Sequence, residues 1–313
     1  MTAVALAGVG AIGYALGRLR SIEELDALAE QPEALAALRA KGVALFSEAE
    51  ETPAQLAAQA ASQTLALSNV AGGDIEALVY ASTSFWEKQF YSEHDVAWLM
   101  NELGLVNAYP IGVFLPGCAN AVTSLRVAVN MIRAEGYRRV LVVTTDKLAP
   151  GDSAKRVMWP DVSVLSDAAA SFIVTSTGDA EFDVTGIGHH SAPYMWDLDG
   201  KSNLAAFLLA TVRGAQKTAD RALLAARLTP GDTRGLITNN YNHAVMRMIA
   251  QKCGFDESQV YLGNVSRFAH GYAADTLINL HDCLAEWPVA PGDSFLMLGT
   301  GHKNWASAVL RKT

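Results

Sequence analysis

The chain has 313 residues, of which 50% are hydrophobic, with a formal net charge of −8 and an isoelectric point near 5.4. This composition supports a large core in one compact unit or two fused halves, and the scattered Lys and Arg residues form no basic face of the kind that binds nucleic acid. No apolar run approaches the ~20 residues that cross a membrane, and the first residues lack the basic region of a signal peptide, so we expect a cytoplasmic protein that does not enter a membrane. The three cysteines, Cys118, Cys253 and Cys283, form no Cys-x-x-Cys pair, which argues against a disulfide framework or a zinc site.

Strand-like apolar segments alternate with longer helical patterns, which is typical of α/β layered folds. The predicted strands are residues 4–10, 77–82, 108–114, 140–145, 171–175, 182–189, 235–238, 259–262, 294–298 and 306–311. The predicted helices are residues 52–68, 96–103, 119–135, 204–227, 244–252 and 272–286. Residues 74–79 resemble residues 232–237, so we expect a duplicated α/β unit with an N-terminal half, 1–176, and a C-terminal half, 177–313.

A Gly-x-Gly-x-x-Gly pattern occupies residues 8–13, at the end of the first predicted strand. A dinucleotide site of this kind also needs a second strand that ends in an acidic residue about 20 positions later. Here the following residues form an Ala-rich helical pattern, with Glu30 and Glu33 inside it. We therefore expect a strand end and a tight turn at this position, and no bound cofactor.

Cys118 follows a strand-like run that stops at Pro116 and Gly117, and a helical pattern begins directly after it. Unpaired N–H groups and the helix macrodipole at a helix N-terminus favour a thiolate, which is a nucleophile that can carry an acyl group as a thioester. The alternative is a buried cysteine that acts as a small hydrophobic side chain.

Four segments of the chain, in this order, resemble the thiolase superfamily and within it the ketoacyl-acyl-carrier-protein synthase III branch. Residues 115–121 are similar to the family's nucleophile turn, residues 141–146 to the strand that follows it, residues 165–171 to a Gly-Asp-Gly-Ala-Gly-Ala segment and residues 298–308 to the C-terminal hairpin. The resemblance implies a five-layered αβαβα thiolase-like fold built from two duplicated halves. It also implies an oxyanion hole formed by the backbone N–H groups of Cys118 and Gly301.

The histidine and asparagine of the family's second oxyanion site have exchanged positions in this chain. Asn239 stands where the family has the histidine of Pro-His-Gln-Ala-Asn, and His270 stands where it has the asparagine of Gly-Asn-Thr-Ser. The resemblance therefore implies that Asn239 and His270 share this second site and that His270 acts as base or hydrogen-bond donor. His243, one helical turn beyond Asn239, is the alternative base.

The segments that clamp the adenine of coenzyme A in this family are replaced at residues 35–43, and the stacking tryptophan is missing. Either coenzyme A is held differently or an acyl carrier protein delivers the acyl thioester to basic residues near the site. The candidate contacts for a carrier protein are Arg156, Arg213, Lys217 and Arg247. The predicted substrate pocket contains the aromatic residues Phe85, Trp86, Phe90, Trp159 and Trp196, of which residues 85–90 also suit a contact to a second subunit, with core packing as the alternative.

The sequence favours an acyltransferase that loads an acyl group from an acyl-CoA or acyl-carrier-protein thioester onto Cys118 and then forms a carbon–carbon bond, in fatty-acid-like or specialised-metabolite biosynthesis. Such a protein is expected to be a homodimer or to pair with a related chain, and to need no metal or cofactor. Acyl transfer to a hydroxyl or amine of a small molecule is the first alternative. A non-catalytic partner subunit of a ketosynthase heterodimer is the second.

Overall fold

A nine-stranded mixed sheet organises the chain in the computed structural model, which describes residues 4–83, 92–149, 153–176, 178, 180–198 and 203–313. The strand order is β11-β12-β13-β10-β1-β9-β6-β4-β5, with parallel pairing between β4 and β5, β4 and β6, and β11 and β12. The strands are β1 (Ala7–Leu16), β4 (Ala77–Ala81), β5 (Tyr109–Val113), β6 (Arg139–Asp146), β9 (Ala168–Thr175), β10 (Phe182–Ser191), β11 (Gly235–Thr238), β12 (Ser294–Thr300) and β13 (Asn304–Lys312). Two small antiparallel sheets pair β2 (Arg18–Ser21) with β3 (Leu45–Glu48), and β7 (Val157–Met158) with β8 (Ser163–Val164).

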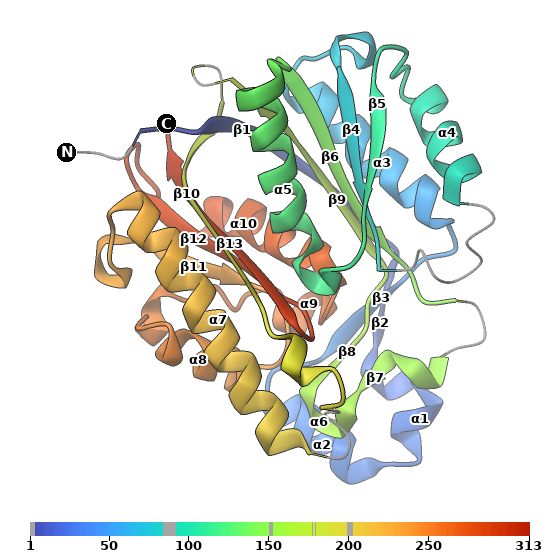
Figure 1. Cartoon of the computed structure of the whole chain (residues 1–313). Helices are drawn as coiled ribbons and strands as arrows, with labels where there is room; N and C mark the ends of the chain where they lie inside the picture. Colours follow the sequence, from blue (N-terminus) through green and yellow to red (C-terminus); the bar gives the residue numbers. More distant parts are fainter. Residues whose placement is uncertain (1–3, 84–91, 150–152, 177, 179, 199–202) are drawn as a thin grey trace.

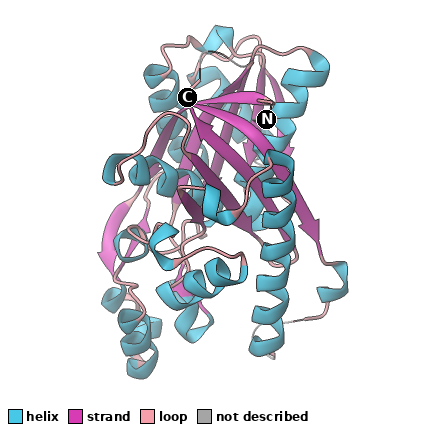
Figure 2. Ribbon diagram, turned by 90° about the vertical axis from the view of Figure 1, so that its left-hand side faces the viewer, coloured by secondary structure: helices cyan, strands magenta, loops and turns pink. Residues whose placement is uncertain are grey.

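The helices form layers on both faces of the large sheet (Figures 1 and 2). They are α1 (Asp26–Ala29), α2 (Pro32–Ala40), α3 (Pro53–Leu67), α4 (Ser92–Glu102), α5 (Asn120–Asn130), α6 (Trp159–Val162), α7 (Leu204–Ala226), α8 (His243–Lys252), α9 (Val265–Phe268) and α10 (Asp275–Glu286). Helix α5 contacts β4 and β6 on one side and β12 and β13 on the other, and α10 also packs on both parts of the sheet. Helix α3 covers the outer face at β1 and β9, and α7 covers it at β10 and β13. The layer order is therefore αβαβα, and the predicted α/β class is confirmed.

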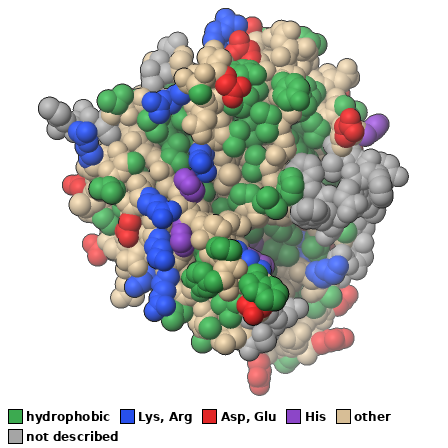
Figure 3. Space-filling model, in the orientation of Figure 1, with side chains coloured by type: hydrophobic (Ala, Val, Ile, Leu, Met, Phe, Trp, Pro, Cys, Tyr) green, Lys and Arg blue, Asp and Glu red, His purple; other side chains and the backbone are tan. Residues whose placement is uncertain are grey.

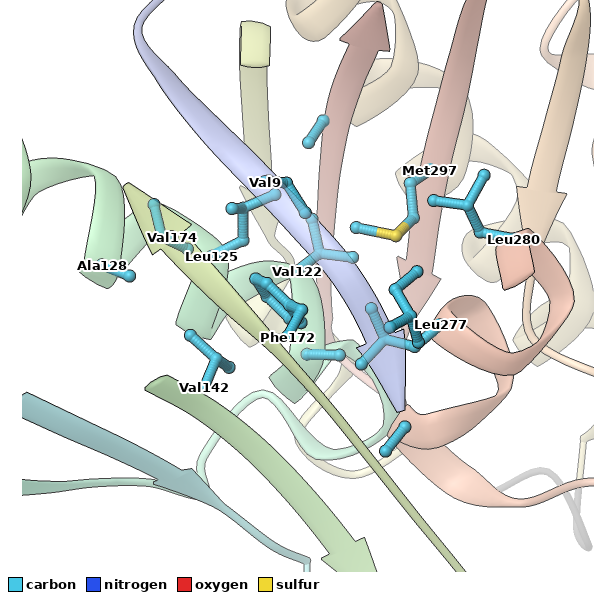
Figure 4. Close-up of a cluster of buried hydrophobic side chains, with 14 of the residues drawn as sticks. Val9, Val122, Leu125, Ala128, Val142, Phe172, Val174, Leu277, Leu280 and Met297 are labelled. Atoms are coloured by element: carbon cyan, nitrogen blue, oxygen red, sulfur yellow. The ribbon is translucent and has the colours of Figure 1, made fainter. Parts of the chain in front are cut away.

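The central core lies where α5 and α10 meet the sheet. Leu125 of α5, Phe172 of β9, Leu277 of α10 and Met297 of β12 are all buried there (Figure 4). Each such side chain contributes about 1.5–3 kcal/mol when it leaves water. This core fixes the two helices whose N-terminal ends carry the site described below.

Most predicted elements are confirmed, and three expectations differ from the structure. The residues after position 13, expected to be helical, also contain the strands β2 and β3 on either side of α1 and α2. Residues 259–262 form no strand, because a 3-10 turn at Glu257–Gln259 leads into a single bridge between Leu236 and Val260. Strand β1 begins later than predicted and continues to Leu16, so the glycine pattern at 8–13 lies inside a strand and the predicted turn is wrong. The halves 1–176 and 177–313 stay a prediction, since one hydrogen-bonded sheet runs through both. Among the described helices, none is both long and apolar enough to cross a membrane.

Gly13 is required for the close packing of β1 against α3. Its N–H donates to Thr64 Oγ1 of α3 at 2.9 Å, and a Cβ at this position would lie 2.4 Å from the carbonyl oxygen of Ala60. We expect Gly13→Ala to lower the free energy of unfolding by about 1–3 kcal/mol, because α3 would have to move away from β1. Urea denaturation measures this loss. Gly73→Ala is the matched control, since only Val106 lies near its added Cβ, and equal losses in both variants would contradict this explanation.

Candidate active site

Cys118 lies in a sharp turn between the edge strand β5 and helix α5. Gly117 has a φ of +60°, which favours glycine, and the N–H of Ala119 donates to the carbonyl of Pro116. The turn Gly117–Ala119 is a short 3-10 segment that continues directly into α5, and Cys118 is partly exposed. Among the described residues, no carbonyl accepts a hydrogen bond from the N–H of Cys118. The cysteine therefore stands at the start of a helix, with its backbone donor available, as its sequence context predicts.

His270 faces the sulfur of Cys118. It is fully buried, and its Nε2 atom lies 3.3 Å from Cys118 Sγ. Its backbone is held on both sides, since its N–H donates to Val164 of β8 and its carbonyl accepts from the N–H of Ser166. The structure thus brings together two predicted residues that are 152 positions apart in the sequence.

Asp275 is a third member of this site that the sequence reasoning missed. It is fully buried at the first position of α10, and its Oδ2 atom accepts a hydrogen bond from His270 Nδ1 at 2.5 Å. The same carboxylate accepts from the backbone N–H groups of Gly271, at 2.6 Å, and Asn240, at 2.8 Å. Because the carboxylate holds a proton on Nδ1, the Nε2 atom faces Cys118 with a lone pair when the imidazole is neutral and with an N–H group when it is protonated. The signal in the sequence was an acidic residue five positions after His270 at a predicted helix start.

The surroundings of His270 favour its protonated form. Burial alone would lower the pKa of His270, but the Asp275 carboxylate and the Cys118 thiolate raise it to about 10. The rings of Tyr241 and Tyr272 lie 5.0 and 5.7 Å from the imidazole and limit the access of water. His270 can therefore take up the thiol proton and leave a nucleophilic thiolate.

The backbone beside His270 is strained. Ala269 and Tyr272 have φ values of +53° and +55°, a region that side chains other than glycine rarely adopt. Such conformations cost about 1–3 kcal/mol each and persist only where the surrounding structure imposes them. Here they turn the chain sharply enough for both His270 and α10 to face Cys118.

Asn239 lies beside the nucleophile turn, but its contacts differ from those of an oxyanion donor. Its Nδ2 group donates to the carbonyls of Tyr272, at 2.8 Å, and Cys118, at 3.3 Å. Its Oδ1 atom accepts from the N–H of Thr300 at 2.8 Å. Since these bonds use both amide hydrogens, Asn239 joins three segments around the site and has no hydrogen left for a substrate.

Gly301 also approaches the nucleophile turn without presenting its N–H group. That N–H donates to the carbonyl of Asn304 at 2.8 Å and closes the loop between β12 and β13. A Cβ at Gly301 would lie 2.2 Å from the carbonyl oxygen of Pro116, so the glycine is needed for close packing. The N–H of Gly301, expected as the second donor of the oxyanion hole, is therefore already hydrogen-bonded. The N–H of Cys118, expected as the first donor, is available.

His243, the alternative base, packs elsewhere. It begins α8, its N–H donates to the carbonyl of Lys41, and its imidazole lies against Gly42, where a Cβ would be 2.4 Å from Cε1. Burial and the charge of Arg247 lower the pKa of His243. The geometry thus favours His270 over His243 as the partner of Cys118.

The predicted pocket is described only in part. Phe85, Trp86 and Phe90 lie outside the described residues, and Trp159 marks the start of α6. Trp196 follows the turn Pro193–Met195 and is 75% exposed, so it lies on the surface and does not line a closed cavity. The described residues contain no cluster of His, Cys, Asp and Glu that could hold a metal ion.

The candidate carrier contacts fall into two groups. Arg156 is buried and binds Asp167 through two hydrogen bonds of 3.0 Å, so it is not accessible to a partner and that expectation is wrong. Arg213 and Lys217 are exposed on α7, and Figure 3 shows Lys and Arg side chains gathered over this helix. Arg247 pairs with Glu257 at 2.8 Å on the surface.

Comparison with known proteins places the chain in a family. The family described as 3-Oxoacyl-[acyl-carrier-protein (ACP)] synthase III matches residues 115–192, and its C-terminal counterpart matches residues 223–312, together more than half of the chain. The beta-ketoacyl-[acyl-carrier-protein] synthase III of Aquifex aeolicus (strain VF5) is 23% identical over 273 residues, which are 84% of this chain and 85% of that protein.

Solved structures agree with this assignment at the level of the fold. The crystal structure of 3-oxoacyl-[acyl-carrier-protein] synthase III from Aquifex aeolicus VF5 has a TM-score of 0.82 at 20% identity, covering 97% of this chain and 99% of the other. The acyltransferase ChlB3 has a TM-score of 0.82 at 20% identity, covering 98% and 97%. The chain therefore belongs to the 3-oxoacyl-[acyl-carrier-protein] synthase III family of the thiolase superfamily, whose members transfer or condense acyl groups.

Proposed function

We propose that this protein is an acyltransferase that takes an acyl group from an acyl-CoA or acyl-carrier-protein thioester onto Cys118 and passes it to a hydroxyl or amine of an acceptor. The observation that carries the proposal is the arrangement of Cys118, His270 and Asp275. Nε2 of His270 lies 3.3 Å from the thiol sulfur, and Nδ1 lies 2.5 Å from the carboxylate. A nucleophile, a base and a group that orients the base form a unit suited to acyl transfer.

In the loading step, Nε2 of His270 takes the proton of the Cys118 thiol, and the thiolate attacks the carbonyl carbon of the donor thioester. The backbone N–H of Cys118 donates to the oxygen that becomes negative. The donor carbon–sulfur bond then breaks, and the leaving thiolate receives the proton from His270. The products are an acyl-Cys118 thioester and the free thiol of the donor.

In the transfer step, Nε2 of the neutral His270 accepts the proton of the acceptor hydroxyl or amine as its oxygen or nitrogen attacks the acyl carbon. The bond to Cys118 Sγ breaks, and the proton on His270 returns to the sulfur. The acceptor gains an acyl group, and the enzyme returns to its starting state. Asp275 stabilises the imidazolium that forms in each step.

Carbon–carbon condensation, which the sequence favoured, makes a different demand on the site. An enolate formed by decarboxylation needs hydrogen-bond donors at its oxygen. The amide hydrogens of Asn239 are already bonded to the carbonyls of Tyr272 and Cys118, which leaves His270 as the single donor of the expected pair, and then only in its protonated form. These contacts support acyl transfer to a hydroxyl or amine over condensation.

Condensation remains the second candidate because several similar proteins carry synthase names, including the priming beta-ketosynthase of the R1128 polyketide pathway, with a TM-score of 0.80. The acyltransferase description of ChlB3 supports the first candidate to the same extent. The intact contact between Cys118 and His270 argues for an enzyme over a non-catalytic partner subunit.

Asn239→Ala separates these two candidates. If Asn239 only positions the nucleophile turn, loading of Cys118 and transfer from it should fall by similar factors, since both steps need the same sulfur position. An oxyanion donor for a second thioester would leave loading intact and slow only the transfer, by roughly 10²–10³-fold. Intact-protein mass follows loading, product analysis follows transfer, and carbon dioxide release from a malonyl thioester reports condensation. If the variant loads Cys118 normally but releases much less carbon dioxide than the unaltered protein, this result would favour condensation and contradict the proposed reaction.

A further inference from the structure

A chain of buried amide groups reaches Asp275 from the side opposite His270. Asn279, one helical turn after Asp275 on α10, donates from Nδ2 to Asn240 Oδ1 and to the carbonyl of Thr238, each at 2.8 Å. Asn240 in turn donates its backbone N–H to Asp275 Oδ2 at 2.8 Å. The side chains of His270, Asp275, Asn240 and Asn279 are all buried, with relative exposures of 0%.

The hydrogen bond that Asn279 accepts from Asn264 fixes the orientation of the Asn279 amide. Its Oδ1 atom accepts a hydrogen bond from Asn264 Nδ2 at 3.0 Å, and Asn264 also donates to Asp282, which pairs with Arg267 at the surface. A rotated amide would place two donors against each other at Asn264. Its Nδ2 group must therefore face Asn240 and the end of β11.

Asn279 thereby joins two elements that meet at the catalytic carboxylate. Asp275 begins α10, and Asn240 is the second residue after the end of β11. Their relative position decides whether the N–H of Asn240 reaches Asp275 Oδ2, the same oxygen that binds His270. Burying an amide costs free energy unless all its polar atoms are hydrogen-bonded. If position 279 served only to pack α10, an apolar side chain would be more favourable there.

We propose that Asn279 is a positioning residue, which holds Asn240 against Asp275 and so keeps the imidazole of His270 aligned with the sulfur of Cys118. The proposal rests on the function proposed above, because it assigns Asn279 to the same site. The titratable groups that face His270 are Asp275, Cys118, Tyr241 and Tyr272. Asn279 acts on Asp275, through Asn240.

The test is the pH profile of acyl transfer by Asn279→Ala, measured on enzyme already loaded at Cys118. We expect transfer to fall about 10-fold or more, since the two hydrogen bonds from Asn279 that hold Asn240 and the end of β11 beside Asp275 are lost. We also expect the midpoint of the profile to move to lower pH, because a carboxylate that turns away no longer stabilises the protonated form of His270. A purely structural role would not move this midpoint.

Cys283→Ala is the matched control. Cys283 is buried one turn further along α10, where the substitution removes a side chain of the helix without touching the amide chain. Its pH midpoint should equal that of the unaltered protein, and its transfer rate should stay within about 2-fold, the variation expected when no contact of the site changes. Asn240→Ala, which removes the Oδ1 acceptor, should shift the midpoint as Asn279→Ala does, and it decides the matter if Asn279→Ala does not fold.

The outcomes separate the two proposals. If the unaltered protein loads and transfers acyl groups, and neither Asn279→Ala nor Asn240→Ala shifts the midpoint, the positioning role is overturned while the proposed function stands. If the unaltered protein never loads Cys118, the proposed function fails first. A shift in Cys283→Ala equal to that of Asn279→Ala would also overturn the role, because any disturbance of α10 would then produce it.

Discussion

Cys118→Ala should abolish acyl loading completely, because the other two cysteines cannot replace it. Burial raises the pKa of Cys253 and of Cys283 to about 12, so both remain protonated and poorly reactive near neutral pH. Intact-protein mass after incubation with acyl-CoA and acyl-carrier-protein thioesters should show one added acyl group in the unaltered protein and none in the variant.

Cys253→Ala is the control for this experiment and should load fully, with the acyl group on the peptide that contains Cys118. Iodoacetamide should also label Cys118 before either of the buried cysteines. Acyl mass that persists in Cys118→Ala, or that maps to Cys253 or Cys283, would contradict the assignment of the nucleophile.

His270→Ala should slow transfer from the loaded enzyme by roughly 10²–10⁴-fold, the usual contribution of a positioned general base. Transfer needs the neutral imidazole, so the rate should rise with pH as His270 loses its proton. In the resting enzyme, Asp275 and the Cys118 thiolate raise the pKa of His270 to about 10. Acylation removes the thiolate charge, so the rising limb for transfer should lie below that value.

Single-turnover transfer, measured across this pH range, checks the assignment of the base. The rising limb should be absent in His270→Ala and unchanged in His243→Ala, whose imidazole packs against Gly42. If the rise of the transfer rate with pH persists in His270→Ala and is absent in His243→Ala, the base is His243 and not His270.

The fold and the position of the nucleophile could be predicted because their signals are local. Alternating apolar segments give the strands, and the step from strand through Pro116 and Gly117 into a helix gives the place of Cys118. The first strand was predicted to end too early because its glycine and alanine residues have low strand propensity, and the packing of Gly13 against α3 overrides that propensity.

The roles around Cys118 could be predicted less well, because they depend on contacts between distant segments. The sequence indicated His270 and Asn239 as neighbours of the nucleophile. It could not indicate that the amide of Asn239 meets the carbonyls of Tyr272 and Cys118. Asp275 was missed for the same reason, since its link to His270 depends on the strained turn between α9 and α10.

The most direct test of the proposed reaction is the fate of the acyl group on a loaded enzyme freed of donor. We expect small molecules that carry hydroxyl or amine groups to discharge Cys118, with the acyl mass recovered on the acceptor and no malonyl thioester required. Asp275→Asn should slow both loading and discharge, since a neutral amide does not stabilise the imidazolium that forms in each step. An acyl-enzyme that resists every hydroxyl and amine, and is discharged only by a malonyl thioester with release of carbon dioxide, would contradict the account.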